Sequence, residues 1–273
     1  MDYFAGLDVS LEKTHICVLD PEGTIVGETV AASTPEAIAA ALSKAPACRS
    51  VVFETGRMVP MLYHGLVERG VPIICIESHQ VYHALKTLAT HKTDRNDARG
   101  PAHLARTGFF KQVHVKSLPS HAVRALIMAR KKLVGQRIML ENQIRGLAVV
   151  FGARLPRGLS ATFVRDVLAM SEGVVGLSAA MRGLISAREA VLSAVAAIDA
   201  DIKHLVRESK ACRRLMTVPG VGPLTALAFG DGVIRRETID GALRCSDRFK
   251  AIYDEIGGHG LHFQPTKMTS ATV

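Results

Sequence analysis

The sequence of 273 residues predicts an α/β fold, in which a mixed domain is followed by a long, mainly helical region. Three observations support this prediction. Short apolar runs alternate with turn residues and helical patterns in roughly the first third of the chain. Leucines then recur every seven residues, and charged residues are distributed very unevenly between the two regions. Because the chain is long enough for two medium-sized domains, the change of pattern favours two.

The first region reads as three strands followed by alternating helices and strands. Turn residues separate the first three apolar runs, so these strands should form an antiparallel meander. The expected elements are strands at residues 3–10, 15–20 and 24–32, a helix at 34–45, a strand at 50–56, a helix at 58–70 and a strand at 71–78. This is the order of elements in the ribonuclease H-like architecture.

Four acidic residues fall at positions that this architecture brings together. Asp8 lies towards the end of the first strand, and Glu54 ends the fourth. Asp94 and Asp97 begin a helix after the fifth strand, and their spacing of three residues puts both on one helix face. Four carboxylates at one edge of a sheet would repel one another, and a divalent cation is the ordinary compensation. A magnesium-dependent phosphodiester enzyme needs such a site.

Each of these acids also has a structural explanation when it is taken alone. Asp94 is a good N-cap, and Asp97 sits in the first helical turn, where a negative charge is stabilising. An acid that ends a strand beside Gly or Ser, as Asp8 and Glu54 do, is often only a turn former. The metal-site interpretation therefore depends on the set of four and on no single residue.

Basic residues are concentrated in the middle of the chain. The net charge is +9, but residues 1–60 carry 4 Lys and Arg against 8 Asp and Glu, whereas residues 86–165 carry 16 against 3. Such a block suits a polyanion, since each neutralised phosphate releases counterions; a solvated helical face is the alternative. The absence of Trp and the presence of only 4 Tyr argue against base stacking, so we expect contacts to the nucleic-acid backbone. The candidate nucleic-acid-binding side chains are Lys92, Arg95, Arg99, Arg130, Lys131, Lys132 and Arg137.

Long amphipathic helices are expected from Ser120 onward. A second apolar series, spaced by threes, fours and sevens, runs through residues 177–205. The two helices should form a helical hairpin or coiled coil, used for self-association or as a spacer. Packing within the hairpin is the alternative to dimerisation, and Arg130 and Arg137 beside the leucine stripe weaken a simple zipper. The leucines that repeat every seven residues in the first helix are Leu126, Leu133, Leu140 and Leu147.

The stretch TVPGVGPLTA, residues 217–226, follows the long helices. Gly220 and Gly222 predict a tight turn, whose backbone N–H groups can face a phosphate as in helix-hairpin-helix modules. A plain turn between helices is the alternative. Beyond Phe229 the composition becomes rich in Gly, His, Ser and Thr, so residues 230–273 are expected to be a poorly ordered tail.

Cysteine usage and hydropathy exclude other classes of protein. The five cysteines are scattered and have no metal-ligand spacing, which predicts free thiols and no transition-metal site. The sequence has no apolar stretch of about 18 residues and no basic segment followed by an apolar one at its start. We therefore expect a cytoplasmic protein without a membrane span or a signal peptide.

Five stretches, in this order, resemble the DEDD transposases of bacterial insertion sequences: GLDVS, FETG, KTDRNDARG, VRALIMARKKLVGQRIMLENQIRGL and VPGVGPLTA. The resemblance is to the group numbered one hundred and ten, which is related to the Piv DNA invertase. It runs from residue 3 to residue 229, and KTDRNDA is its most specific motif.

The resemblance implies a RuvC-like domain whose catalytic residues Asp8, Glu54, Asp94 and Asp97 bind Mg²⁺ or Mn²⁺. It also implies DNA and a structured guide RNA from the same element as partners. The long helices add the expectation of a homodimer or higher oligomer. The implied domains are a RuvC-like DEDD domain at 1–115, a helical coiled-coil connector at 116–210, the start of a C-terminal transposase domain with the PGVG turn at 211–229, and a divergent tail at 230–273.

The resemblance stops before the family's second catalytic group. Family members continue to a Ser-Gly motif whose serine is the proposed nucleophile, whereas Ser246 and Ser270 lie in no matching context. We therefore expect a chain of the DNA transposase and recombinase class that binds DNA or RNA but does not complete strand exchange. The alternatives are a stand-alone nuclease of branched DNA, which needs the acids but no serine, and a non-catalytic nucleic-acid-binding remnant.

Overall fold

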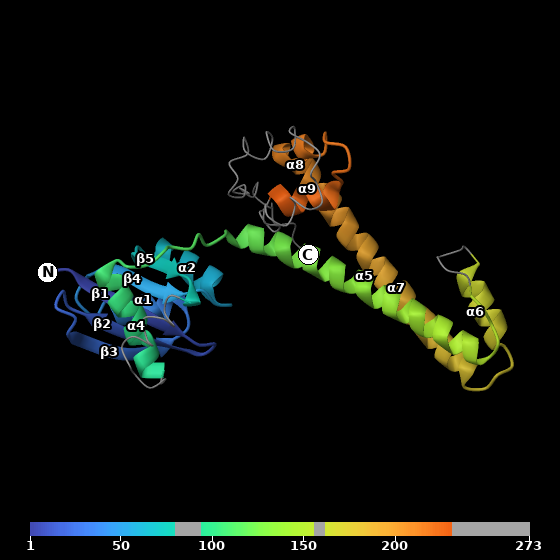
Figure 1. The fold of residues 1–273 in the computed structure, drawn as a ribbon, viewed down its shortest axis with the longest axis horizontal. Coiled ribbons are helices and arrows are strands. Elements are labelled where there is room, and N and C mark those ends of the chain that lie inside the picture. The colour runs from blue at the N-terminus through green and yellow to red at the C-terminus, as the bar shows by residue number, and fades with distance from the viewer. Residues whose placement is uncertain (80–93, 156–161, 231–273) are drawn as a thin grey trace, which may run out of the picture. The chain divides into compact units, whose positions relative to one another are not determined.

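The computed structural model describes residues 1–79, 94–155 and 162–230. The chain divides into two compact units between Leu118 and Pro119 (Figure 1). The predicted boundary after residue 115 lies close to this division. Within the three described ranges, no helix is both long enough and apolar enough to cross a membrane. The expected tail falls outside these ranges from residue 231 onward.

The first unit contains five strands: β1 Tyr3–Val9, β2 Lys13–Leu19, β3 Ile25–Ala32, β4 Cys48–Glu54 and β5 Ile73–Ile76. They form one sheet with the order β3-β2-β1-β4-β5. The first three strands pair antiparallel, as expected for a meander, whereas β4 and β5 continue the sheet beyond β1 in the parallel direction. The strands predicted from the apolar runs are therefore confirmed, and the unit has a mixed α/β fold.

Three helices of this unit are described: α1 Pro35–Leu42, α2 Val59–Glu68 and α4 Asp94–Thr107. α1 begins where its sequence predicts, because the hydroxyl of Thr34 accepts a hydrogen bond from the backbone N–H of Ala37 at 3.2 Å and so caps the helix. Proline stands in the first turn of both α1 and α2, where its missing N–H has no helical partner to lose.

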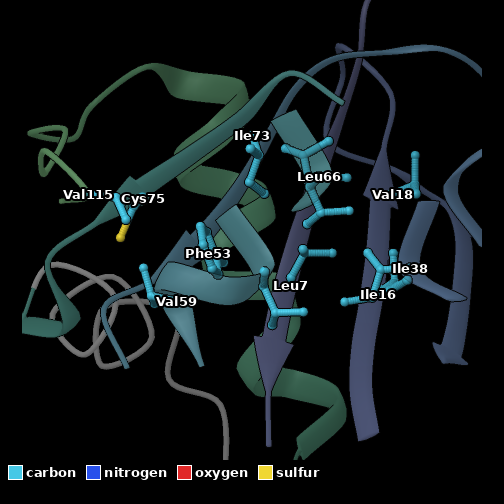
Figure 2. Packing of buried hydrophobic residues seen from close by; sticks show 13 residues of the cluster. Leu7, Ile16, Val18, Ile38, Phe53, Val59, Leu66, Ile73, Cys75 and Val115 are labelled. Carbon is cyan, nitrogen blue, oxygen red and sulfur yellow. The ribbon is translucent and has the colours of Figure 1, made fainter. Parts of the chain in front are cut away.

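One face of the sheet packs against α1 and α2. Alternate residues of the strands point to this face and form a buried cluster with the apolar sides of the two helices (Figure 2). Its most buried labelled members, each completely shielded from solvent, include Leu7 of β1, Phe53 of β4, Ile38 of α1 and Leu66 of α2. The alternation fixes which strand residues point to the opposite face.

α4 covers the opposite face and runs in the direction opposite to β1. Near its start, Ala98 and Ala102 come so close to Gly6 of β1 that a Cβ on Gly6 would overlap their backbone atoms. Near its end, the carbonyl oxygen of Ala105 accepts a hydrogen bond from the hydroxyl of Ser50, early in β4, at 3.5 Å. The N-terminus of α4 therefore lies at the edge of the sheet where β1 and β4 end.

Gly6→Ala should destabilise the first unit by about 2 kcal/mol or more, because the added methyl group meets backbone atoms, which cannot rotate away. Urea unfolding followed by circular dichroism measures this loss as a lower transition midpoint. Gly27→Ala in β3 is the matched control, since no atom lies within 4 Å of a Cβ built there. Equal midpoints for the two variants would contradict the close approach of α4.

The second unit contains α5 Leu118–Val150, α6 Phe163–Ser171, α7 Leu177–Glu208, α8 Lys210–Leu215 and α9 Pro223–Gly230. The two long helices, α5 and α7, run antiparallel along each other (Figure 1). Arg130 near the middle of α5 pairs with Asp199 of α7, and Glu141 further along α5 pairs with Arg188, earlier in α7. The two long helices predicted from the apolar repeats are confirmed, whereas α6 was not predicted.

The leucine stripe of α5 forms only part of the seam of this hairpin. Its four leucines are only half-buried. Leu126 and Leu147 pack against two apolar clusters that also contain Val123 and Ile144 of α5 and residues of α7. Between these clusters, Arg130 and Glu141 of α5 pair with Asp199 and Arg188 of α7. Apolar clusters therefore close the two ends of the hairpin, and charged residues occupy its middle.

Candidate functional site

The C-terminal ends of β1 and β4 carry two of the predicted acids side by side. These strands are parallel, and Leu7 of β1 is opposite Phe53 of β4, so Asp8 and Glu54 are the next residues along the two strands. Leu7 and Phe53 point to the face covered by α1 and α2. Because side chains alternate along a strand, Asp8 and Glu54 point to the face that α4 covers.

α4 brings the other two acids to the same edge. Asp94 is its first residue, and Asp97 lies one turn further and directly before Ala98, which packs close to Gly6 of β1. Asp8, Glu54 and Asp97 are all half-buried. The side chain of Asp94 lies outside the described residues. The ends of three elements thus meet where the sequence predicted the four acids.

The carboxylates are not gathered into a finished cage. Over the described part of the chain, no three His, Cys, Asp or Glu side chains lie close enough together to hold a metal ion. The side chain of Asp94 is not among these described residues. The structure therefore brings Asp8, Glu54 and Asp97 to one edge and one face, and the metal ion stays a prediction.

His15 is a neighbour of this edge that the sequence reasoning missed. It lies directly opposite Asp8 in the antiparallel β1–β2 pair. Cys17 and Leu19 of β2 pack against α4, so His15 points to the same face by alternation. The short turn between β1 and β2 sets the register that pairs His15 with Asp8, so the turn length in the sequence could have predicted this neighbour.

A hollow of about 220 Å³ lies beside the acids, between α4 and the outer strands. His15, Cys17, Glu28 and Ala98 contribute to its lining. Burial, followed by the negative charge of Glu28, raises the pKa of the Cys17 thiol to about 11. The thiol is therefore protonated at neutral pH, the form in which a cysteine is a weak nucleophile.

Arg99 of the KTDRNDAR motif is engaged with the protein itself. Its Nε donates a hydrogen bond to Oε1 of Glu28 in β3 at 2.8 Å, and the Glu28 side chain is only 13% exposed. This hydrogen bond raises the pKa of Arg99. The sequence assigned Arg99 to nucleic-acid binding, which no observation tests. Of its predicted companions, Lys92 and the side chain of Arg95 lie outside the described residues.

The basic residues predicted on α5 fall into two groups. Arg130 donates to Asp199 at 2.5 Å, and this hydrogen bond raises the pKa of Arg130 and lowers that of Asp199. Arg137 lies 3.7 Å from Glu141. Lys131 and Lys132, by contrast, are exposed. These two lysines are the ones best placed to contact a phosphate backbone.

The PGVG turn joins α8 to α9. Gly220 and Gly222 are exposed, and Gly220 has a φ of 84°, which favours glycine. The sequence analysis missed the basic residues before this turn, although their density was a usable signal. Glu208 is the one acidic residue between positions 203 and 214. The exposed basic residues there are Lys203, Arg207, Lys210, Arg213 and Arg214.

Comparison with known proteins identifies the family. Residues 5–150 match the family model of the DEDD transposases of IS110 type, described as transposases. The transposase for insertion sequence element IS1111A of Coxiella burnetii is 27% identical over 227 residues, which cover 82% of this chain and 61% of that protein. A probable family 20 transposase of Pseudomonas aeruginosa is 31% identical over 142 residues, which cover 50% of this chain and 42% of that protein.

This chain thus spans less than two thirds of the length of either relative. The family match nevertheless includes β1, β4 and α4, which carry the four acids, and all of α5. It covers more than half of the chain. The chain therefore belongs to the IS110 family of DEDD transposases.

Proposed function

We propose that this transposase acts on DNA through a divalent-metal site formed by Asp8, Glu54, Asp94 and Asp97, with Mg²⁺ or Mn²⁺ as the ion. The observation that carries the proposal is the meeting of β1, β4 and α4 at one edge of the sheet. Carboxylate oxygens are the ligands that both ions prefer, so this donor set fits them. Half-buried carboxylates of like charge also favour a bound cation over their mutual repulsion.

The bound metal would activate an attacking oxygen and stabilise the leaving oxygen of a phosphodiester. The chain's own residues would position the ion and the nucleic acid. Asp94 and Asp97 lie in the first turn of α4, where the positive end of the helix dipole stabilises negative charge. Exposed lysines and arginines of the second unit would neutralise the backbone of the bound strand.

The partners that we propose are DNA and a structured guide RNA, acting in the cytoplasm, with self-association through the long helices. The basic block of residues 86–165 supports the proposal that the chain binds a polyanion, and the family resemblance supports RNA as one of its partners. That this chain by itself does not complete strand exchange is a proposal of the same kind, because the chain spans only part of its relatives.

The test of the proposed function is cleavage of branched and linear DNA with Mg²⁺, with Mn²⁺ and with EDTA. Metal-dependent nicking that Asp97→Asn abolishes is the expected result. Nicking of branched DNA but not of linear DNA would favour the stand-alone nuclease. Salt-sensitive binding without any turnover would favour the non-catalytic nucleic-acid-binding remnant.

The double variant Lys131→Gln/Lys132→Gln should weaken DNA binding across sequences and flatten its dependence on salt. Each lost phosphate contact lowers the slope of log K against log salt by about 0.9. Fluorescence anisotropy in EDTA measures this slope without any role for a metal. Arg130 is left intact because its removal would also break the pair with Asp199.

Two further variants complete this experiment. Lys44→Gln changes an exposed lysine of the acidic N-terminal segment, and it should leave the slope unchanged. The triple variant Lys210→Gln/Arg213→Gln/Arg214→Gln tests the exposed basic residues before the PGVG turn. If only the triple variant flattens the slope, the block of residues 86–165 is not the main contact.

A further inference from the structure

We infer that the Arg99–Glu28 ion pair is a positioning device for the acids of α4, and that it sets the affinity of the site for divalent ions. The inference rests on the proposed function, because it concerns the same four carboxylates. Arg99 and Glu28 do not contact the ion in this proposal. They act through the placement of Asp97 and Asp94 relative to Asp8 and Glu54.

The ion pair lies where it can fix the start of α4. Arg99 is two residues beyond Asp97, and its guanidinium reaches Glu28 on β3, two strands away from β1 in the sheet. Glu28 is well shielded, with 13% of its side chain exposed, whereas Arg99 is 32% exposed. A charged hydrogen bond to so shielded a partner restricts where the first turns of α4 can lie on the sheet.

The other end of α4 offers an internal comparison. Arg106 donates a hydrogen bond from Nη1 to the carbonyl oxygen of Pro21 at 3.2 Å, and so links the last turn of the helix to the loop after β2. Arg99 and Arg106 therefore have similar structural roles in the same helix. Only Arg99 lies near the acids, since Asp97 is two residues from Arg99 and nine from Arg106.

Placement of the acids matters because they come from three separate elements, so one ion can contact them together only if the start of α4 is held close to the ends of β1 and β4. Residues that orient metal ligands without touching the ion commonly change metal affinity by about 10-fold to 100-fold when they are replaced. A small shift of the first turn of α4 would move Asp94 and Asp97 together away from Asp8 and Glu54.

For one variant, Arg99→Gln, the effect of charge on Mn²⁺ affinity and the effect of positioning on it have opposite signs. Arg99→Gln removes a positive charge close to a cation site, which by electrostatics should strengthen binding of Mn²⁺. Loss of positioning should weaken it. Glu28→Gln does not separate the two effects, since loss of a negative charge also weakens cation binding. Arg99→Gln is therefore the test, and Arg99→Lys, which keeps the charge and a donor for Glu28, is its conservative rescue.

Isothermal titration of the full chain with Mn²⁺ gives the affinity, and thermal unfolding without metal gives the structural cost of each variant. We expect Arg99→Gln to weaken Mn²⁺ binding by about 10-fold to 100-fold. Arg99→Lys should recover most of this affinity. Arg106→Gln should lower the thermal midpoint about as much as Arg99→Gln does, but it should keep the wild-type affinity for Mn²⁺.

Two results would overturn the inference while leaving the proposed function intact: wild-type or tighter binding by Arg99→Gln, and equal weakening by Arg106→Gln. A wild-type chain that binds no divalent ion would instead overturn the proposed function, and this inference with it. Circular dichroism of each variant shows whether the fold is kept. If Arg99→Gln does not fold, the double variant Arg99→Met/Glu28→Leu decides, because it removes the ion pair without changing the net charge or leaving a shielded charge unpaired. Weaker Mn²⁺ binding than in the wild type would support the inference, and wild-type binding would overturn it.

Discussion

Asp8→Asn should remove divalent-ion binding and metal-dependent DNA cleavage while the first unit stays folded. Asn has nearly the same size and shape as Asp but lacks the negative charge that a hard cation requires. Replacing a residue that only orients a metal ligand costs about 10-fold to 100-fold in affinity, so loss of a direct ligand should cost at least 100-fold. Titration with Mn²⁺ and a nicking assay measure the two losses.

The stability of the same variant without metal gives a second, independent readout. Asp8 lies beside Glu54 at the ends of neighbouring strands, on the face where α4 begins with two more acids. If these carboxylates repel one another, removing one charge should leave the metal-free protein as stable as wild type or more stable. In the wild type, addition of Mn²⁺ should raise the thermal midpoint, and in Asp8→Asn it should not.

Asp20→Asn is the matched control for Asp8→Asn. Asp20 follows β2, whose end lies next to the start of β1, so it occupies the opposite edge of the same sheet. Its Oδ1 accepts a hydrogen bond from the backbone N–H of Thr24 at 2.7 Å, which an Asn side chain can also accept. Loss of Mn²⁺ binding in Asp20→Asn as well would show that the effect is not specific to the acidic edge.

The positions of the acids could be predicted because they depend on local patterns. The alternation of apolar residues fixes each strand, and the last residue of a strand lies at a sheet edge whatever the details of packing. The order of the strands then puts Asp8 and Glu54 on neighbouring parallel strands. Asp97 follows from the start of a helix, which the KTDRNDAR segment signals through its cap residue.

The contacts of Arg99 could not be predicted in this way. Its pairing with Glu28 depends on the register of three strands and on how closely α4 approaches the sheet at Gly6, and neither is visible in a local pattern. The leucine repeat of α5 predicted the helix but not all of its buried face, for a related reason. A spacing of seven describes any one stripe of a helix, and the partner helix decides which stripe is buried. The buried positions of α5 include Val123, Glu141 and Ile144, none of which belongs to the leucine series.

Glu141→Ala should destabilise the second unit by about 3–5 kcal/mol, the cost of leaving a buried charge without its partner. The side chains of Glu141 and Arg188 are only 8% and 7% exposed, and Nε of Arg188 donates to Oε1 of Glu141 at 3.1 Å. Arg137 adds a second guanidinium 3.7 Å from the same oxygen. Removal of Glu141 would therefore leave two positive charges facing each other inside the hairpin.

The effect should extend to α6. The guanidinium of Arg188 also lies over the ring of Phe163, 5.3 Å from its centre, and Phe163 is the first residue of α6 and is 1% exposed. An Arg188 that lost its acidic partner would move towards water and would no longer cover this ring. Hydrogen exchange should accordingly show faster opening of α6 in Glu141→Ala than in the wild type.

Asp199→Ala is the matched control, since it breaks the other pair between α5 and α7. Asp199 and Arg130 are 35% and 27% exposed, so solvent screens their attraction, and the loss should be about 1 kcal/mol or less. Urea unfolding compares the two variants directly. A combined replacement, Glu141→Leu/Arg188→Met, should recover most of the stability, because apolar residues of similar volume remove the need for a buried charge to be paired. If Glu141→Ala costs no more than Asp199→Ala, the buried pair does not hold the middle of the hairpin together.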